Sequence, residues 1–175
     1  MKVYLIRHTS VDVPRGVCYG QTDVPLRATF PEEAAQVKER LAGIKFDKIY
    51  ASPLSRCTKL AKACGFDDYT PDDRLKEINF GEWEMQRFED ITDHRLQEWY
   101  DDYENVRATG GESFADQGAR LKNFLDELKT RDFDTVAVFA HGGILANAMK
   151  MFMGMRIDEV FDKQAVYGAV IQIEI

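Results

Sequence analysis

The sequence lacks the features that mark membrane, secreted and nucleic-acid-binding proteins. It contains no apolar run long enough to cross a bilayer and no basic-then-apolar leader, so we expect neither membrane insertion nor secretion. Its net charge of −7 argues against non-specific binding of nucleic acid and against a general attraction for anionic substrates. An anion would therefore have to be bound in a local positive pocket.

Cysteine is also scarce, and its three positions do not have the spacing of a metal site. Cys18, Cys57 and Cys64 are an odd number, which is typical of reduced thiols and predicts a cytoplasmic protein. No repeat, low-complexity tract or interdomain linker is visible. With 175 residues, 45% of them hydrophobic, the chain is long enough to bury a sizeable core. We expect a single domain over residues 1–175.

Only three histidines are present, and two of them directly follow apolar runs. Residues 2–6 predict a buried strand, which Arg7 and His8 follow without a break. Residues 135–140 predict another strand, and His141 follows it. An Arg-His pair taken alone is commonly an ion-paired arginine beside an ordinary loop histidine. The second strand changes that interpretation, because ligands in open α/β sheets bind at the edge where the strands end.

A third expected strand, residues 49–51, ends in the same kind of position. Ser52 is predicted to cap the following helix, with Pro53 at its first position. Arg56 then lies on the first turn of that helix, where free backbone N–H groups and the helix dipole favour an anion. If the three strand ends converge, two imidazoles and two guanidiniums line one pocket.

The alternation of strands with helices predicts the fold class. Helices are expected from Pro31, after Ser52, after Ser113 and after His141, and residues 167–175 are expected as a strand within the sheet or at its edge. We therefore expect a three-layer α/β/α sandwich on a mostly parallel sheet. Residues 84–112 are rich in aromatic and charged side chains and predict an irregular cap over the pocket, with His94 on its surface.

Four motifs occur in order along nearly the whole chain. They are Leu-Ile-Arg-His-Thr at residues 5–9, Ser-Pro-Leu-Ser-Arg at 52–56, Leu-Lys-Glu-Ile-Asn-Phe-Gly-Glu-Trp-Glu at 75–84 and Ala-His-Gly-Gly at 140–143. Together they resemble the histidine phosphatase superfamily, whose other major members are the cofactor-dependent phosphoglycerate mutases. Residues 16–26 resemble the α-ribazole phosphatase branch, which acts in assembling the nucleotide loop of cobalamin. Thr9 and Met85 stand where many members have glycine, and both are expected to reshape the pocket rim.

The resemblance implies a phosphoglycerate mutase-like fold and a phosphomonoesterase that acts through a phosphohistidine. Arg7 and Arg56 can hold the phosphate oxygens in bidentate fashion, and His8 can attack phosphorus. His141 is expected to stabilise charge on the transferring group. Glu77 aligns with the carboxyl group that protonates the leaving oxygen. No His-x-His pattern or cluster of acidic ligands is visible, so we expect no metal and no other cofactor.

Two assignments stay open within this set. Glu82 and Glu84 lie close to Glu77 in the sequence and are rival candidates for the acid. Thr9 could offer its hydroxyl to a phosphate, or it could bond to the local backbone.

A long loop separates the first expected strand from the first expected helix. Gly20, Gln21 and Thr22 within it could bring amide N–H groups and a hydroxyl to a substrate. The resemblance places this loop beside the nucleophile. We therefore expect these three residues to contact the substrate.

More than one function is compatible with these residues. The leading prediction is removal of phosphate from α-ribazole 5'-phosphate in cobalamin nucleotide-loop assembly, and the nearest alternative is a phosphatase of broad or sugar-phosphate specificity. A phosphoglycerate mutase is less favoured, because the chain is short and its expected cap is acidic at Asp101, Asp102 and Glu104. A non-catalytic phosphate-binding module is the remaining alternative. The expected partner is a small-molecule phosphomonoester rather than nucleic acid or a membrane, and the sequence leaves the oligomeric state open.

Overall fold

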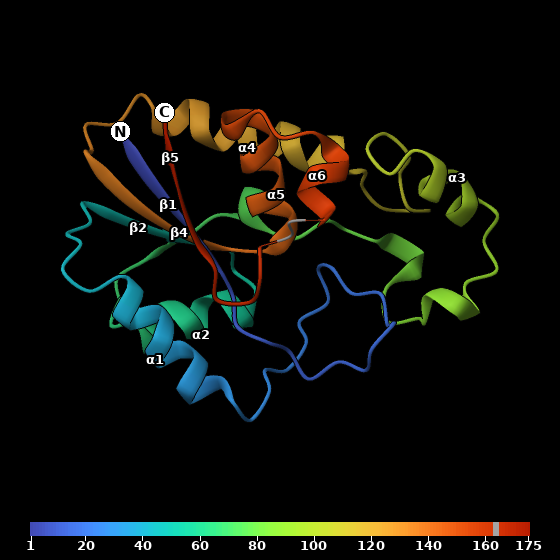
Figure 1. Cartoon of the computed structure of the whole chain (residues 1–175), viewed down its shortest axis with the longest axis horizontal. Helices are drawn as coiled ribbons and strands as arrows, with labels where there is room; N and C mark the ends of the chain where they lie inside the picture. Colours follow the sequence, from blue (N-terminus) through green and yellow to red (C-terminus); the bar gives the residue numbers. More distant parts are fainter. Residues whose placement is uncertain (163–164) are drawn as a thin grey trace.

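The computed structural model, which describes residues 1–162 and 165–175, is built around one five-stranded sheet (Figure 1). The strand order is β3-β2-β4-β1-β5. Strands β1 to β4 pair in parallel, and β5 pairs with β1 antiparallel at one edge. The strand bounds are β1 Lys2–Arg7, β2 Lys48–Ala51, β3 Thr70–Pro71, β4 Thr135–Ala140 and β5 Val170–Glu174.

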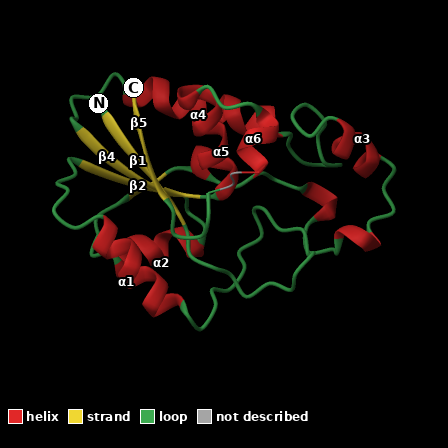
Figure 2. Cartoon of the chain, in the orientation of Figure 1, coloured by secondary structure: helices red, strands yellow, loops and turns green. Residues whose placement is uncertain are grey.

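Helices cover both faces of the sheet, as Figure 2 shows in red against the yellow strands. Helices α1 (Phe30–Arg40) and α2 (Ser55–Ala63) lie on one face. On the other face lie α4 (Phe114–Leu128), α5 (Gly142–Met153) and α6 (Ile157–Asp162). The predicted three-layer α/β/α sandwich on a mostly parallel sheet is confirmed.

Strand β4 is the centre of the core, and its sequence explains why. Five of its six residues are buried, as expected for a parallel strand with helices on both sides. On one face Val138 packs with Leu121 and Leu145, and on the other Phe139 packs with Leu60. Because both faces of this strand are buried, polar side chains are expected only in the residues that follow its end.

The pairing register brings the strand ends together. Arg7 pairs with Ala140 across β1 and β4, so the next residues, His8 and His141, emerge side by side. Ala51 pairs with Phe139 across β2 and β4, which brings the chain after β2 to the same edge. All three predicted strand ends therefore meet, as parallel pairing requires.

The prediction that Ser52 caps the helix after β2 is wrong. Helix α2 begins at Ser55, and its N-cap is Leu54. Ser52 is fully buried, and its hydroxyl lies 2.7 Å from His141 Nε2 while accepting a 3.4 Å bond from the Leu54 N–H. The Ser52 hydroxyl, which was expected to cap the helix, is thus in contact with the imidazole of His141. Arg56 still lies on the first turn of α2.

Residues 84–112, called the cap segment here, extend away from the sheet. They contain a short 3-10 turn, Phe88–Asp90, and helix α3, Arg95–Asp101, at the far end of the molecule in Figure 1. Trp99 anchors this cap segment by packing against Trp83 and stacking with Phe88. The cap segment then returns to α4. Among the described residues, no helix combines the length and apolar character needed to cross a membrane.

Met85 lies at the start of the cap segment in an unusual backbone conformation. Its φ is +65°, and it is the one non-glycine residue with positive φ in the described part of the chain. Its side chain is about half exposed, so its packing offsets little of the free-energy cost of the strained backbone. The left-handed conformation explains why a glycine suits this position.

We expect Met85→Gly to raise the free energy of unfolding by about 0.5–1 kcal/mol, because relief of the left-handed strain exceeds the entropy that glycine loses on folding. Urea denaturation followed by circular dichroism measures the change. Met85→Ala is the matched control, since alanine removes the exposed thioether but keeps the β-carbon. An equal gain in both variants would assign the effect to the side chain instead of the backbone.

Candidate active site

His8 and His141 face each other where β1 and β4 end. Their ring centroids are 5.2 Å apart, and both side chains are buried. Nδ1 of His8 lies 2.7 Å from the carbonyl oxygen of Thr9. A carbonyl can only accept, so Nδ1 carries the proton and Nε2 of His8 keeps a free lone pair.

Both imidazoles are held in the neutral form. Burial lowers the pKa of His8 well below its usual value, and the positive charges of Arg56 and Arg7 lower it further. Burial and the charge of Arg56 likewise lower the pKa of His141. At neutral pH, His8 is therefore an uncharged imidazole with a free ring nitrogen, and His141 is an uncharged hydrogen-bonding group.

Arg56 is fully buried and is held by the loop before α1. Its Nη1 donates to the Thr22 carbonyl at 3.0 Å and its Nη2 to the Gly20 carbonyl at 2.5 Å. These neutral acceptors fix the guanidinium, and no carboxylate among the described residues forms an ion pair with it, so its positive charge is uncompensated. The site therefore has an excess of positive charge in a buried place, which favours an anion.

Arg7 lies beside a glycine that makes room for it. A β-carbon at Gly142 would lie 3.0 Å from Cζ of Arg7. The guanidinium sits 4.3 Å from the centre of the Tyr167 ring, and its Nη1 donates to the Ala165 carbonyl. The ring and the carbonyl orient Arg7 without neutralising it.

Three buried side-chain polar atoms in the described part of the chain have no hydrogen-bond partner. They are Nε of Arg7, Oγ1 of Thr9 and Nε of Arg56. Buried polar groups normally have partners, so the two unsatisfied guanidinium donors close to His8 indicate a place for an acceptor from a ligand. Thr9 does not form the backbone bond that the sequence left open.

Of the three candidate acids, Glu77 alone lines the cavity beside Arg7. Oε1 of Glu77 accepts from the Ile78 N–H at 3.0 Å and from Gln117 Nε2 at 2.8 Å, and Oε2 accepts from the Gly143 N–H at 3.2 Å. Glu82 is exposed and lies on the rim of a different hollow. These bonds hold the carboxyl group of Glu77 in one orientation.

Glu84, the other rival, organises the loop that holds Arg56. Its carboxylate accepts from the backbone N–H groups of Gln21 and Thr22, each at 2.7 Å, and from the Thr22 hydroxyl. The donors of Gln21 and Thr22 that were expected from the sequence to reach a substrate are thus bonded to Glu84. Substrate contact by Gly20, Gln21 or Thr22 stays a prediction, and the role that the contacts show is the positioning of Arg56.

The cavity at the strand ends has a volume of about 280 Å³, and aromatic rings make up much of its wall. Arg7 and Glu77 supply its charged groups. The rings come from the long loop, the stretch just before the cap segment, the cap segment itself and the chain before β5, and belong to Tyr19, Phe80, Phe88, Tyr103 and Tyr167. The sequence showed an aromatic-rich cap but gave no sign that rings from four separate segments share one wall.

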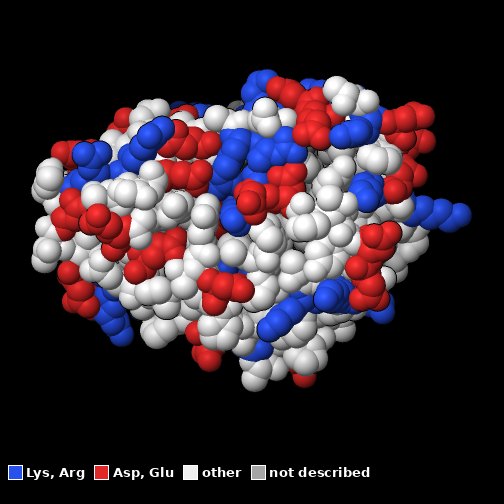
Figure 3. Space-filling model, turned by 180° about the vertical axis from the view of Figure 1, so that it is seen from behind, with Lys and Arg blue, Asp and Glu red and all other residues white. Residues whose placement is uncertain are grey.

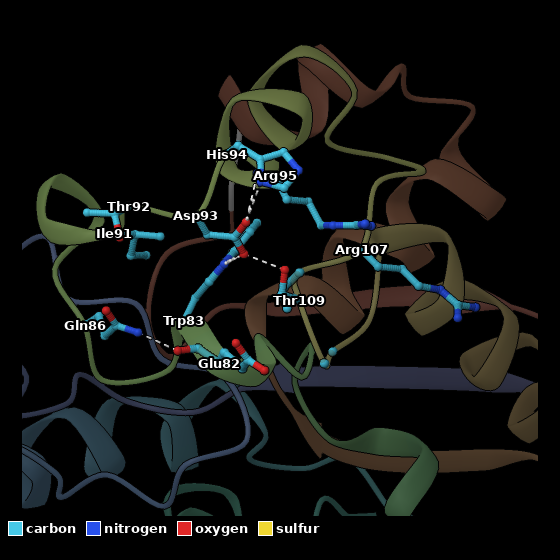
Figure 4. Close-up of a pocket in the computed structure, with 13 residues that line it drawn as sticks. Glu82, Trp83, Gln86, Ile91, Thr92, Asp93, His94, Arg95, Arg107 and Thr109 are labelled. Atoms are coloured by element: carbon cyan, nitrogen blue, oxygen red, sulfur yellow. Dashed lines mark hydrogen bonds and ion pairs between the residues drawn. The ribbon is translucent and has the colours of Figure 1, made fainter.

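A larger hollow of about 740 Å³ lies within the cap segment (Figure 4). Its central carboxylate, Asp93, accepts from Trp83 Nε1 at 2.8 Å, Thr109 Oγ1 at 2.5 Å and the Arg95 N–H at 3.0 Å. The Thr109 and Trp83 bonds lower the pKa of Asp93 to about 2. Arg107, on the rim, pairs with Asp116 at 2.7 Å. Asp93, Trp83 and Thr109 hold the cap together there, whereas Arg7 and Glu77 line the cavity at the strand ends, which is therefore the candidate active site.

Surface charge adds little to the attraction for an anion. Figure 3 shows acidic and basic side chains interspersed over one face of the molecule. On that face there is no broad basic surface. The positive charge suited to a phosphate comes from the half-buried Arg7 and the fully buried Arg56, in agreement with the local pocket expected from a net charge of −7.

Comparison with known proteins identifies relatives of this architecture. The model of the histidine phosphatase superfamily (branch 1) matches residues 3–175. The chain is 27% identical over 184 residues to the adenosylcobalamin/alpha-ribazole phosphatase of Escherichia coli (strain K12), covering 100% of this chain and 90% of the relative. It is 31% identical over 166 residues to the probable phosphoglycerate mutase GpmB of Enterobacter sp. (strain 638), covering 89% and 76%. The crystal structure of the alpha-ribazole phosphatase from Shigella flexneri has the same fold, with a TM-score of 0.89 at 24% identity, covering 100% and 91%.

We expect the free energy of unfolding to fall as the pH drops from 7 to 5. Below about pH 6.5 the unfolded chain protonates His8 and His141, whereas the folded protein keeps both neutral because their pKa values are lowered. Each histidine then costs up to about 1.4 kcal/mol per pH unit until its folded pKa is reached. Chemical denaturation at several pH values measures this slope.

The control is the double variant His8→Gln, His141→Gln, in which the slope between pH 6.5 and 5 becomes shallower. Slopes are compared, so a change in absolute stability does not affect the result. An unchanged slope would show that these two histidines are not the titrating groups.

Proposed function

The chain belongs to branch 1 of the histidine phosphatase superfamily, and from this we propose that it is a phosphomonoesterase that removes phosphate from α-ribazole 5'-phosphate, through a phosphohistidine formed on His8. The relative named adenosylcobalamin/alpha-ribazole phosphatase, which this chain matches over its whole length, supports the substrate. We place the enzyme in the cytoplasm, in keeping with three free cysteines.

The observation that carries the substrate class is the aromatic wall of the cavity. Arg7 and Glu77 supply the groups for phosphate chemistry, while Tyr19, Phe80 and Phe88 are among the rings that face the same space. α-Ribazole carries a flat benzimidazole on its ribose, which such rings can stack against. A simple sugar phosphate has no apolar part to bury there.

The first half of the reaction transfers the phosphoryl group to the protein. Arg7 and Arg56 hold the phosphate oxygens, and the Nε2 lone pair of His8 attacks phosphorus opposite the ester oxygen. The new N–P bond forms as the P–O ester bond breaks, and the bonding electrons leave with the ester oxygen. Glu77 donates its proton to that oxygen, which releases the alcohol. His141 stabilises the charge on the group in transfer.

The second half returns the enzyme to its starting state. A water molecule gives its proton to the carboxylate of Glu77 and attacks phosphorus. The N–P bond breaks, and its electrons restore the lone pair on Nε2 of His8. Inorganic phosphate leaves, and Glu77 is again protonated for the next cycle.

The alternatives differ in what else the site would need. A mutase must bind a second phosphate on its substrate, and this chain's cap segment presents Asp101, Asp102 and Glu104, with Lys150 already paired to Glu104. A phosphatase of broad specificity would use the same residues with little preference among alcohols. A non-catalytic binding module would not need Glu77 within the cavity.

A substrate panel in the presence of a metal chelator tests the substrate class. We expect kcat/KM for α-ribazole 5'-phosphate to exceed that for ribose 5-phosphate by about 10- to 100-fold, the rate equivalent of burying one aromatic ring. Phe88→Leu should reduce this preference while leaving ribose 5-phosphate unchanged, and His8→Ala should abolish both activities. Equal rates that depend on His8 would indicate a broad-specificity phosphatase. Failure to release phosphate from any monoester would favour the binding module.

The assignment of Glu77 as the acid has its own test. We expect Glu77→Gln to lower kcat/KM by about 100- to 10,000-fold for an alkyl phosphate but much less for 4-nitrophenyl phosphate, whose leaving group needs no proton. Single-turnover kinetics of phosphoenzyme formation measures the step directly. Glu82→Gln is the matched control and should behave as wild type. A similar loss of kcat/KM with both substrates would show that Glu77 is not the acid.

A further inference from the structure

Two buried amides lie behind the carboxyl group of Glu77. Gln117 on α4 is fully buried, and Asn147 on α5 is 3% exposed. Nε2 of Gln117 donates to Oε1 of Glu77 at 2.8 Å, and Nδ2 of Asn147 donates to Oε1 of Gln117 at 3.2 Å. The three side chains form a line from the core to the cavity.

Gln117 interrupts the apolar stripe by which α4 packs on the sheet. Phe114, Leu121 and Phe124 on the same face are buried hydrophobic residues. An amide at such a position costs free energy unless its groups are hydrogen-bonded, and a hydrophobic side chain would pack as well. The bond to Glu77 therefore explains why a polar residue lies there.

The contacts of Asn147 fix the direction of the line. Nδ2 of Asn147 also lies 3.3 Å from the Phe114 carbonyl and 3.2 Å from the Gly143 carbonyl, and both can only accept. Its Nδ2 must then be the donor toward Gln117, whose Oε1 accepts. The amide nitrogen of Gln117, Nε2, therefore faces Glu77 and donates to its Oε1.

Glycines on both helices allow the close approach that this line needs. A β-carbon at Gly143 would lie 2.4 Å from Oε1 of Gln117 and 2.4 Å from Oε1 of Glu77. A β-carbon at Gly118 would lie 2.5 Å from Oδ1 of Asn147. The two helices are thus built around these contacts.

The two oxygens of Glu77 are consequently different. Oε1 accepts two bonds, from Ile78 and Gln117, whereas Oε2 accepts one, from Gly143 at 3.2 Å. We propose that Gln117, oriented by Asn147, is a positioning residue that keeps Oε1 occupied and presents Oε2 as the oxygen that exchanges the proton with the leaving group. The proposal rests on the function proposed above, in which Glu77 is the acid.

The test is Gln117→Met, which keeps the length of the side chain and removes the N–H donor. We expect kcat/KM for an alkyl phosphate to fall by about 10- to 100-fold, the cost of losing a hydrogen bond to the carboxylate that forms as Glu77 gives up its proton. For 4-nitrophenyl phosphate the change should be less than about threefold, because that leaving group needs no acid. Inhibition by inorganic phosphate should not change, since Arg7, Arg56 and His8 are intact.

The matched control is Gln97→Met, the same substitution at an exposed amide on α3, which should leave every rate unchanged. In the double variant Glu77→Gln, Gln117→Met we expect no loss beyond that of Glu77→Gln alone. Multiplying losses would overturn the proposal, because Gln117 would then act independently of Glu77. Equal loss for the two esters in Gln117→Met would also overturn it and would indicate a packing role.

Wild type and Glu77→Gln show whether the proposed function itself fails, separately from the role of Gln117. If wild type releases no phosphate, or if Glu77→Gln affects both esters equally, Glu77 is not the acid and the role of Gln117 is overturned with it. If both of those proteins behave as expected and Gln117→Met matches wild type, the role of Gln117 alone is overturned.

Discussion

The buried positive charge of Arg56 is the constraint on which the rest of the site depends. A guanidinium without a carboxylate partner is costly in the core unless polar groups hold it, and here two backbone carbonyls of the loop before α1 do so. Burial lowers the pKa of both His8 and His141, and the same charge lowers it further. One uncompensated cation thus prepares a place for an anion and, together with burial, keeps His8 unprotonated.

The loop that holds Arg56 is shaped in turn by a carboxylate from the start of the cap segment. Glu84 accepts the N–H groups of Gln21 and Thr22, and a β-carbon at Gly20 would lie 1.9 Å from the Ile78 carbonyl. Arg56, the loop and the turn at Glu84 therefore form one unit. Met85, whose backbone is strained, immediately follows Glu84. The free-energy cost of this strain therefore arises next to the carboxylate that holds the loop.

The layers of the fold and the meeting of three strand ends could be predicted because they depend on local pattern. Apolar runs followed at once by His8 and His141 identify strand ends, and parallel pairing then brings the ends together. The cap at Ser52 was wrong because its hydroxyl is used by an imidazole 89 residues away. The role of Glu84 was not predictable for the same reason: its partners lie 62 and 63 residues earlier, and spacing along the chain says nothing about such pairs.

Glu77 and Glu84 lie seven residues apart in the sequence. In the structure they differ in how many hydrogen-bond donors each carboxyl group accepts from. Glu84 accepts from three backbone N–H groups, at Gln21, Thr22 and Phe80, and from a hydroxyl, so both of its oxygens are committed to holding the loop. Glu77 is held mainly through one oxygen, while the other accepts a single backbone bond. A carboxyl group can exchange a proton only where an oxygen keeps a lone pair free. The donors contributed by α4 and α5 therefore suit Glu77 to proton transfer, and those of the loop before α1 suit Glu84 to support.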